Sequence, residues 1–167
     1  MDTYFRTLNA RDWEELERLA AVIWHQCYRE LLGQQQISYM LEKFLTVEVF
    51  KRQEEEGYVY RGLFVNGEMI GFTASYDEGE RVFLSKLYLR EDYHHQGLGR
   101  KMLADVIGLY PGRDELYLTV NKYNRAYEMY RHLGFEVSDA VVTDIGAGYV
   151  MDDYVMHLDL RKAHFSV

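Results

Sequence analysis

Hydrophobic positions in the first third of the chain follow a short strand and then the spacing of helices. Residues 4–8 are strand-like, and residues 9–12 offer side chains that cap a helix. Apolar residues then recur every three or four positions, at Trp13, Leu16, Leu19, Ala20, Ile23 and Trp24. After a loop expected at Gly33 and the three glutamines behind it, a second helical zone is predicted over residues 38–56.

The middle of the chain has the pattern of an antiparallel meander. Residues 57–65 are strand-like, and Asn66-Gly67 is a strong signal for a two-residue hairpin. Residues 68–76 return as the partner strand. A turn at residues 77–80 then precedes a third strand at residues 81–89.

The last part of the chain alternates helices and strands. A helical pattern follows Gly97 and ends at Pro111-Gly112, and residues 115–120 form the next predicted strand. A second helix starts at Asn124, and Gly134 is placed as its C-cap. The core stripe of this helix is Ala126, Met129, Tyr130 and Leu133. Two final strands are predicted at residues 135–145 and 149–160.

The predicted order of elements is therefore β-αα-βββ-α-β-α-ββ, a fold of the mixed α/β (α+β) class. The length of 167 residues and the hydrophobic content of 48% suit one domain, residues 1–167, with a sizeable core. One proline and no low-complexity run argue against a linker or a second domain.

Composition narrows the classes of function. A net charge of −8 disfavours non-specific nucleic-acid binding, and it is compatible both with a cationic substrate and with ordinary solubility. Cys27 is the single cysteine and lies in an apolar helical pattern, so we expect a buried thiol rather than a nucleophile. We expect no metal, because the adjacent His94 and His95 lack ligand spacing. With neither a signal peptide nor a membrane span in the pattern, the expected location is the cytoplasm, with no membrane partner.

The segment Tyr93-His94-His95-Gln96-Gly97-Leu98-Gly99-Arg100-Lys101 joins the third strand of the meander to a helix. Glycine at a helix N-terminus permits close approach to free backbone N–H groups, as a phosphate or pyrophosphate requires. Glycine also suits a tight strand-to-helix turn for its own geometry. The segment alone leaves both interpretations open.

Two motifs in order resemble those of the GNAT superfamily of acetyl-CoA-dependent N-acetyltransferases. His94-His95-Gln96-Gly97-Leu98-Gly99 is similar to the motif Arg/Gln-x-x-Gly-x-Gly/Ala, except that His94 stands in the first position. The segment 118–135 is similar to the second signature, in which a strand is followed by an asparagine, an alanine and a tyrosine, and then by Gly-Phe. The loop also resembles that of the polyamine acetyltransferase branch.

The resemblance implies a mixed, mostly antiparallel sheet of about seven strands flanked by about four helices. It implies acetyl-CoA as cosubstrate, with Tyr130 as the acid that protonates the leaving thiolate. The residues it implies for coenzyme A binding are Leu87, Tyr88, Leu89, Gln96, Gly97, Leu98, Gly99, Arg100, Lys101 and Asn124. Tyr130 also fits a core position on its helical stripe, and Asn124 also suits an N-cap.

The resemblance further implies an acceptor site for a primary amine of a small molecule or a peptide, bordered by the N-terminal helices. The candidate acceptor residues are His25, Tyr28, Ser85, Asp152 and Tyr154. For the two helical ones, a solvated helix face is the alternative. Many relatives hold a glutamate near the position of Ser85, so the general base stays unassigned.

Two other functions fit parts of the same pattern. A non-catalytic acyl-CoA-binding or sensor module would keep the fold without turnover, and a nucleotide-binding α/β domain would use the glycine turn for a different phosphate. A homodimer through the C-terminal strands is compatible with the apolar residues 150–158. The sequence does not identify the acceptor amine.

Overall fold

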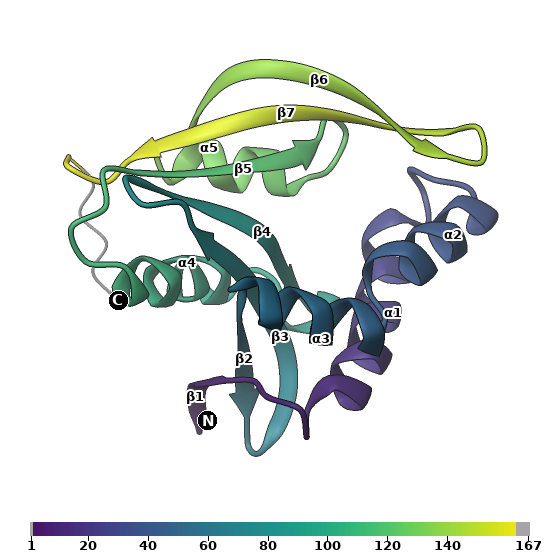
Figure 1. Cartoon of the computed structure of the whole chain (residues 1–167), viewed down its shortest axis with the longest axis horizontal. Coiled ribbons are helices and arrows are strands. Elements are labelled where there is room, and N and C mark those ends of the chain that lie inside the picture. The colour runs from purple at the N-terminus through teal and green to yellow at the C-terminus, as the bar shows by residue number, and fades with distance from the viewer. Residues whose placement is uncertain (1, 163–167) are drawn as a thin grey trace.

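A computed structural model describes residues 2–162 of the chain, and its elements are arranged around one curved sheet (Figure 1). The elements in chain order are β1 (Thr3–Thr7), α1 (Trp13–Tyr28), α2 (Gln34–Phe44), α3 (Val47–Glu56), β2 (Val59–Val65), β3 (Glu68–Asp77), β4 (Arg81–Leu89), the short 3-10 helix η1 (Glu91–Tyr93), α4 (Leu98–Leu109), β5 (Glu115–Asn121), α5 (Ala126–His132), β6 (Glu136–Gly146) and β7 (Tyr149–Asp159).

The seven strands form one sheet in the order β1-β2-β3-β4-β5-β7-β6. Strands β4 and β5 are parallel, and every other neighbouring pair is antiparallel. The predicted fold class and the mostly antiparallel sheet are therefore confirmed.

The helical zone predicted over residues 38–56 is two helices, so the described residues hold five α-helices rather than about four. The chain becomes extended at Thr46, and the Thr46 hydroxyl accepts a hydrogen bond from the Val49 N–H at 3.3 Å, which caps α3. The glutamines predicted to be a loop form the first turn of α2 instead. The buried residues Ile37 and Met40 hold that helix against the core.

Helices cover both faces of the sheet. Helices α1, α2 and α3 pack through Trp13, Phe50 and their neighbours on one face, against Tyr60 and Phe72 of the sheet. Helices α4 and α5 pack on the other face, where Leu103 and Tyr130 join a second core with strands β4, β5 and β7. Among the described residues, no helix is both long and apolar enough to cross a membrane.

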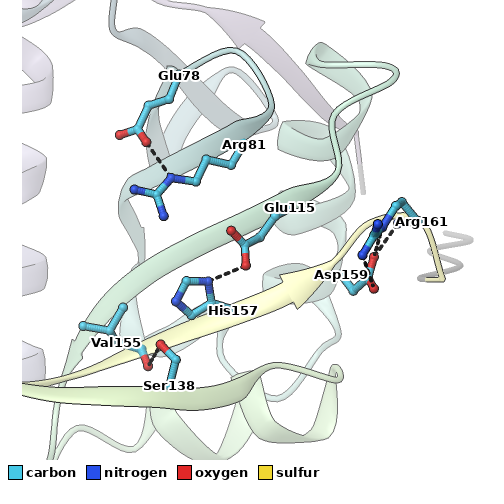
Figure 2. Close-up of polar contacts among 8 residues, drawn as sticks. All are labelled: Glu78, Arg81, Glu115, Ser138, Val155, His157, Asp159 and Arg161. Atoms are coloured by element: carbon cyan, nitrogen blue, oxygen red, sulfur yellow. Dashed lines mark hydrogen bonds and ion pairs between the residues drawn. The ribbon is translucent and has the colours of Figure 1, made fainter.

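Strands β4 and β5 are paired at one end only. Their register covers three pairs, from Arg81 with Glu115 to Phe83 with Tyr117, and beyond these the strands diverge (Figure 1). Polar contacts surround the closed end: Arg81 Nε donates to Glu78 at 2.8 Å, and His157 Nδ1 lies 2.5 Å from the Glu115 carboxylate (Figure 2). The divergence leaves one edge of β4 unpaired from Leu84 onward.

Strand β4 also contains a bulge at Ser85. Ala74 pairs with Lys86, but the next residue, Ser75, pairs with Leu84, so Ser85 is an extra residue. Leu84 belongs to the core with α4, whereas Tyr88 packs against the core with α1. The bulge therefore changes which face of the sheet the later side chains of β4 occupy.

Candidate active site

The glycine turn adopts a conformation that requires glycine. Gly97 has φ of 77° at the N-cap of α4, and an added Cβ there would meet no atom within 4 Å. The N–H of Lys101 is used within the helix, because it donates to the Gly97 carbonyl at 3.3 Å. The N–H groups between these two residues belong to the first helical turn, which has no intrahelical acceptors for them.

Gly99 serves a second purpose. A Cβ at Gly99 would lie 2.7 Å from Met129 Sδ, so the glycine lets α5 approach the start of α4. His94, which stands where the family pattern has Arg or Gln, places Nε2 2.9 Å from the Leu89 carbonyl. The tight-turn interpretation thus applies to Gly97, whose open surroundings are also compatible with a phosphate cradle, whereas Gly99 is explained by close packing of α5.

The strand that leads into this turn presents a free edge. Leu87, Tyr88 and Leu89 pair with Thr73, Phe72 and Gly71 of β3 on one side. On the other side β5 has already diverged. The main chain of these three residues can therefore pair with an extended ligand, as an added strand would.

Asn124 joins two elements beside the open edge. Its Oδ1 accepts a hydrogen bond from the Ala126 N–H at 2.9 Å, but the N-cap of α5 is Arg125, so Asn124 lies one residue before the predicted capping position. Its Nδ2 donates to the Tyr28 hydroxyl at 3.2 Å, and Tyr28 is buried at the end of α1. Asn124 therefore fixes the start of α5 against α1.

Tyr130 is buried in the same region, with 5% of its surface exposed, and its ring lies edge-on to Phe135 at 5.3 Å. Burial raises the pKa of Tyr130 well above its ordinary value, with a smaller contribution from Cys27. Within residues 2–162 its hydroxyl has no hydrogen-bond partner. Tyr130 thus stays protonated and is able to donate a proton.

Two partly buried residues, Cys27 and Tyr88, lie beside Tyr28 in the same region. Burial raises the pKa of the Cys27 thiol to about 11, so the thiol is a poor nucleophile, as its apolar pattern predicted. Tyr88 packs between Trp24 and Phe72, with ring centroids 5.8 Å and 5.6 Å away. Burial also raises the pKa of Tyr88. The cluster is therefore neutral at physiological pH.

The two acceptor candidates on β7, Asp152 and Tyr154, both contact other side chains of the protein. Asp152 forms an ion pair with Lys122 at 2.9 Å, and Tyr154 packs on Tyr127 of α5 with ring centroids 5.2 Å apart. Asp153, which the strand pattern placed on the opposite face, is buried with 6% of its surface exposed. Burial raises the pKa of Asp153 to about 6, and the charge of Asp152 adds to the effect.

The other two acceptor candidates are placed differently. His25 holds its ring against its own helix, with Nδ1 2.8 Å from the Ala21 carbonyl. Ser85 lies at the bulge and accepts from Lys86 Nζ at 3.3 Å. Lys86, which the sequence analysis did not select, is buried beside Gln53, and burial lowers its pKa to about 8.

The sequence contained only a weak signal for these two buried charges. The sequence pattern indicated that Asp153 faces away from Asp152, but charged residues are seldom buried, and nothing in the pattern indicated that Asp153 is buried.

No group of three or more His, Cys, Asp or Glu side chains in residues 2–162 is arranged to hold a metal ion.

The profile of the acetyltransferase (GNAT) family matches residues 13–135. The chain is 28% identical over 160 residues to a spermidine N(1)-acetyltransferase of Thermoplasma acidophilum, covering 91% of this chain and 97% of that protein. It is 31% identical over 120 residues to a spermine/spermidine N(1)-acetyltransferase of Bacillus subtilis, covering 63% of this chain and 76% of that protein.

The fold is similar to that of a solved structure, the PaiA N-acetyltransferase from Thermoplasma acidophilum in complex with coenzyme A. The TM-score is 0.80 with 24% identity, and the match covers 95% of this chain and 99% of that chain.

Proposed function

Because this chain belongs to the acetyltransferase (GNAT) family, we propose that it transfers an acetyl group from acetyl-CoA to a primary amine of a polyamine. The family establishes the coarser activity, acetyl-CoA-dependent transfer to an amine. The polyamine class of acceptor is the finer proposal. The observation that supports the site best is the unpaired edge of β4, which leads from the glycine turn to Tyr88, a residue on which Tyr130 acts electrostatically.

The pyrophosphate of coenzyme A would bind at the N-terminus of α4. The N–H groups of residues 96–100 and the positive end of the helix dipole suit a dianionic group there. The side chains of Arg100 and Lys101 stand in the same first turn and would add positive charge. The Lys101 N–H already donates a hydrogen bond to the Gly97 carbonyl, so it would not bind the pyrophosphate.

The pantetheine arm would pair with the free main chain of Leu87, Tyr88 and Leu89. This direction leads from the glycine turn toward the gap where Asn124 meets Tyr28. The thioester at the end of the arm would then lie near Tyr130, whose hydroxyl lacks a partner among the described residues.

The chemistry needs no covalent enzyme intermediate. The neutral amine attacks the thioester carbonyl and forms the C–N bond, and the C–S bond then breaks. The sulfur would take the proton of the Tyr130 hydroxyl, which burial keeps protonated. Once the C–N bond has formed, the nitrogen carries one surplus proton, and it gives this proton to the Tyr130 phenolate.

A polyamine is favoured as acceptor by the names of two relatives and by charge. The relatives from Thermoplasma acidophilum and Bacillus subtilis are named as spermidine and spermine/spermidine acetyltransferases. A net charge of −8 would attract a polycation to the chain. Peptide amines and other small amines are the acceptors against which this proposal must be tested.

The deciding experiment measures release of coenzyme A from acetyl-CoA with spermidine, spermine, amino acids, an aminoglycoside and short peptides. Products should be separated before detection, because Cys27 carries a free thiol. We expect polyamines to give the highest kcat/KM. Preference for another amine class would overturn the acceptor proposal. Tight acetyl-CoA binding without release would instead favour a sensor module, and protection of the fold by ATP alone would favour a nucleotide-binding domain.

A further inference from the structure

Asp153 is a buried carboxylate without a partner. Within residues 2–162 its side chain accepts no hydrogen bond and forms no ion pair, although 94% of the residue's surface is buried. The other buried aspartate, Asp12, accepts two hydrogen bonds from Arg6, at 2.9 and 3.0 Å. Burying an unpaired carboxylate is costly, so a protein that keeps one has a use for it or a ligand that pairs with it.

Asp153 faces the side of the sheet on which α1 ends. Its neighbour Tyr154 packs against α5 on one face, and strand alternation turns Asp153 to the other. Met151, on the same face as Asp153, packs against the core that contains α1 and α2. The charge of Asp153 acts on Tyr28 and contributes to the raised pKa of that phenol.

This position lies beside the proposed thioester site. Tyr28 accepts the hydrogen bond from Asn124, and Cys27 next to it acts electrostatically on Tyr130. Asp153 is thus grouped with Tyr130 around the end of α1. The pairing of β4 with β5 stops before this region, which leaves the gap through which the pantetheine would reach it.

Among the described residues, no cation from the elements packed around Asp153 neutralises it. In register it lies between Asn121 of β5 and Val141 of β6, and α1 contributes the neutral Tyr28. Asp152 on its own strand is negative, and Lys122 is paired with Asp152. An ammonium group of the acceptor would supply the missing positive charge.

Strand β4 holds no acidic residue that could act as base. Residues 81–89 contain neither aspartate nor glutamate, Ser85 occupies the bulge, and Lys86 beside it is a buried cation. A proton acceptor for the amine must therefore come from another element.

We propose that Asp153 binds the ammonium group of the acceptor and removes its proton. The inference rests on the proposed function, since it needs an amine as acceptor. An N–H bond of the ammonium breaks, the proton moves to a carboxylate oxygen of Asp153, and the electron pair stays on nitrogen. That pair forms the C–N bond with the thioester carbon, and as the C–S bond breaks the departing sulfur takes the proton of Tyr130. The nitrogen, which still carries one surplus proton, passes it to the Tyr130 phenolate and becomes the amide nitrogen. Asp153 then loses its proton to solvent.

The test compares Asp153→Asn with Asp159→Asn on the same strand, using spermidine and acetyl-CoA. Asp159 forms an ion pair with Arg161 at 3.1 Å and lies opposite Glu115, at the closed end of β4 and β5. For the wild type we expect kcat/KM for the amine to rise to a plateau above about pH 6 and stay level until the amine itself titrates, because the carboxylate accepts the proton. For Asp153→Asn we expect at least a 100-fold loss at pH 7. The residual rate should rise tenfold per pH unit, because only free amine reacts. Asp159→Asn should keep the level profile within about threefold of wild type.

Two kinetic outcomes would overturn the proposal. One is an Asp153→Asn enzyme with the rate and the level pH profile of wild type. The other is a uniform loss of rate with the wild-type pH profile, which would indicate a structural role. Unchanged acetyl-CoA affinity of Asp153→Asn verifies the fold, and Asp153→Ser provides a second variant if the amide disturbs it.

Failure of the polyamine proposal gives a different pattern. If the wild type releases coenzyme A with another amine class and not with spermidine, the same pH comparison is run with that amine. If no amine reacts, calorimetry of spermidine with the coenzyme A complex replaces kinetics. Asp153→Asn should then bind spermidine at least tenfold more weakly than wild type. Equal binding by the two proteins would overturn the role of Asp153, and so would a wild type that does not bind spermidine.

Discussion

The two ends of the proposed site are built from different parts of the chain. The cofactor end is a continuous segment from Leu87 to Lys101, and its groups are main-chain amides at a strand edge and a helix N-terminus. The acceptor end collects side chains from separate elements: Tyr28 from α1, Asn124 from the loop before α5, Tyr130 from α5 and Asp153 from β7.

This difference has a physical basis. A main-chain cradle depends on conformation, so it requires glycine at defined positions and tolerates changes in most side chains. A proton-transfer site depends on individual functional groups, whose burial decides their protonation. Substitutions at the two ends should therefore produce different kinetic signatures: weaker acetyl-CoA binding at the first and slower chemistry at the second.

The largest effect is expected at the acceptor end, from Tyr130→Phe. Loss of the phenolic proton should lower kcat by about 100-fold, within the range of general acid catalysis, while KM for acetyl-CoA changes little. Tyr110→Phe removes a hydroxyl that contacts Ser75 at 2.8 Å, remote from the proposed site, and serves as control. Steady-state kinetics checks both variants. An unchanged kcat for Tyr130→Phe would show that Tyr130 is not the acid.

At the cofactor end, Gly97→Val should have the next largest effect. A β-branched residue is strained at φ of 77°, at about 1–3 kcal/mol, and relief of that strain would move the N–H groups of the turn. We expect KM for acetyl-CoA to rise by about 10- to 100-fold, with a smaller change in kcat. Gly108→Ala in the same helix has open space and ordinary φ, so it should leave KM unchanged. Equal KM values for the two variants would contradict a role for the turn.

The burial of Asp153 should also affect the stability of the folded protein. Its folded-state pKa of about 6 is above the ordinary value, so the folded protein loses stability as pH rises and the loss is complete above pH 6. Asp153→Asn should therefore raise the free energy of unfolding by about 1–2 kcal/mol at pH 7.5, and this gain should vanish as pH falls below 4.

Denaturant unfolding at several pH values checks this expectation. Asp12→Asn is the opposing control, since Arg6 lowers the pKa of Asp12 and the folded state is stabilised by its charge. That variant should lose stability at pH 7.5. A loss of stability in Asp153→Asn as well would mean that Asp153 has a partner in the folded protein.

The smallest effect is expected from His94→Arg, which restores the usual residue of the family motif. The histidine contacts the Leu89 carbonyl and lies on the surface, so its loss should cost little. An arginine near the pyrophosphate should lower KM for acetyl-CoA by up to about threefold, as an exposed charge pair contributes less than 1 kcal/mol. A larger gain, measured by acetyl-CoA titration, would show that side chains matter more at this end than the comparison implies.

The fold was predictable wherever local signals were strong. Asn66-Gly67 located the hairpin between β2 and β3, and the bounds of β4 matched the prediction. The break between α2 and α3 was missed because Leu45 and Thr46 carry no glycine or proline, and the cap at Thr46 acts through its hydroxyl. The glutamines before Ile37 were misassigned because polar residues fit a loop and an exposed first helical turn equally well.

The candidate site was predictable in the same uneven way. Gly97 and Tyr130 could be selected because motifs mark them, although their roles stay predictions until tested. Asp153 could not be selected, because the chain brings it close to Tyr28, which lies 125 residues before it, only in the folded protein. The same holds for Lys86, whose burial follows from the bulge one residue before it and from the position of α3.

The bulge at Ser85 adds one residue to β4, and this changes which face of the sheet each later side chain occupies. Residues before it keep one assignment of faces, and those after it are shifted by one, so a single strand can supply Leu84 to one core and Tyr88 to the other. Deleting Ser85 would restore a uniform alternation. Lys86 and Leu87 would keep their pairing with Ala74 and Thr73 and the faces that they now occupy, whereas a strand with Ser85 paired in register would move Lys86 into the apolar core under α4 and Leu87 to the opposite face. One residue with a small side chain thus sets the facing of the whole remaining strand.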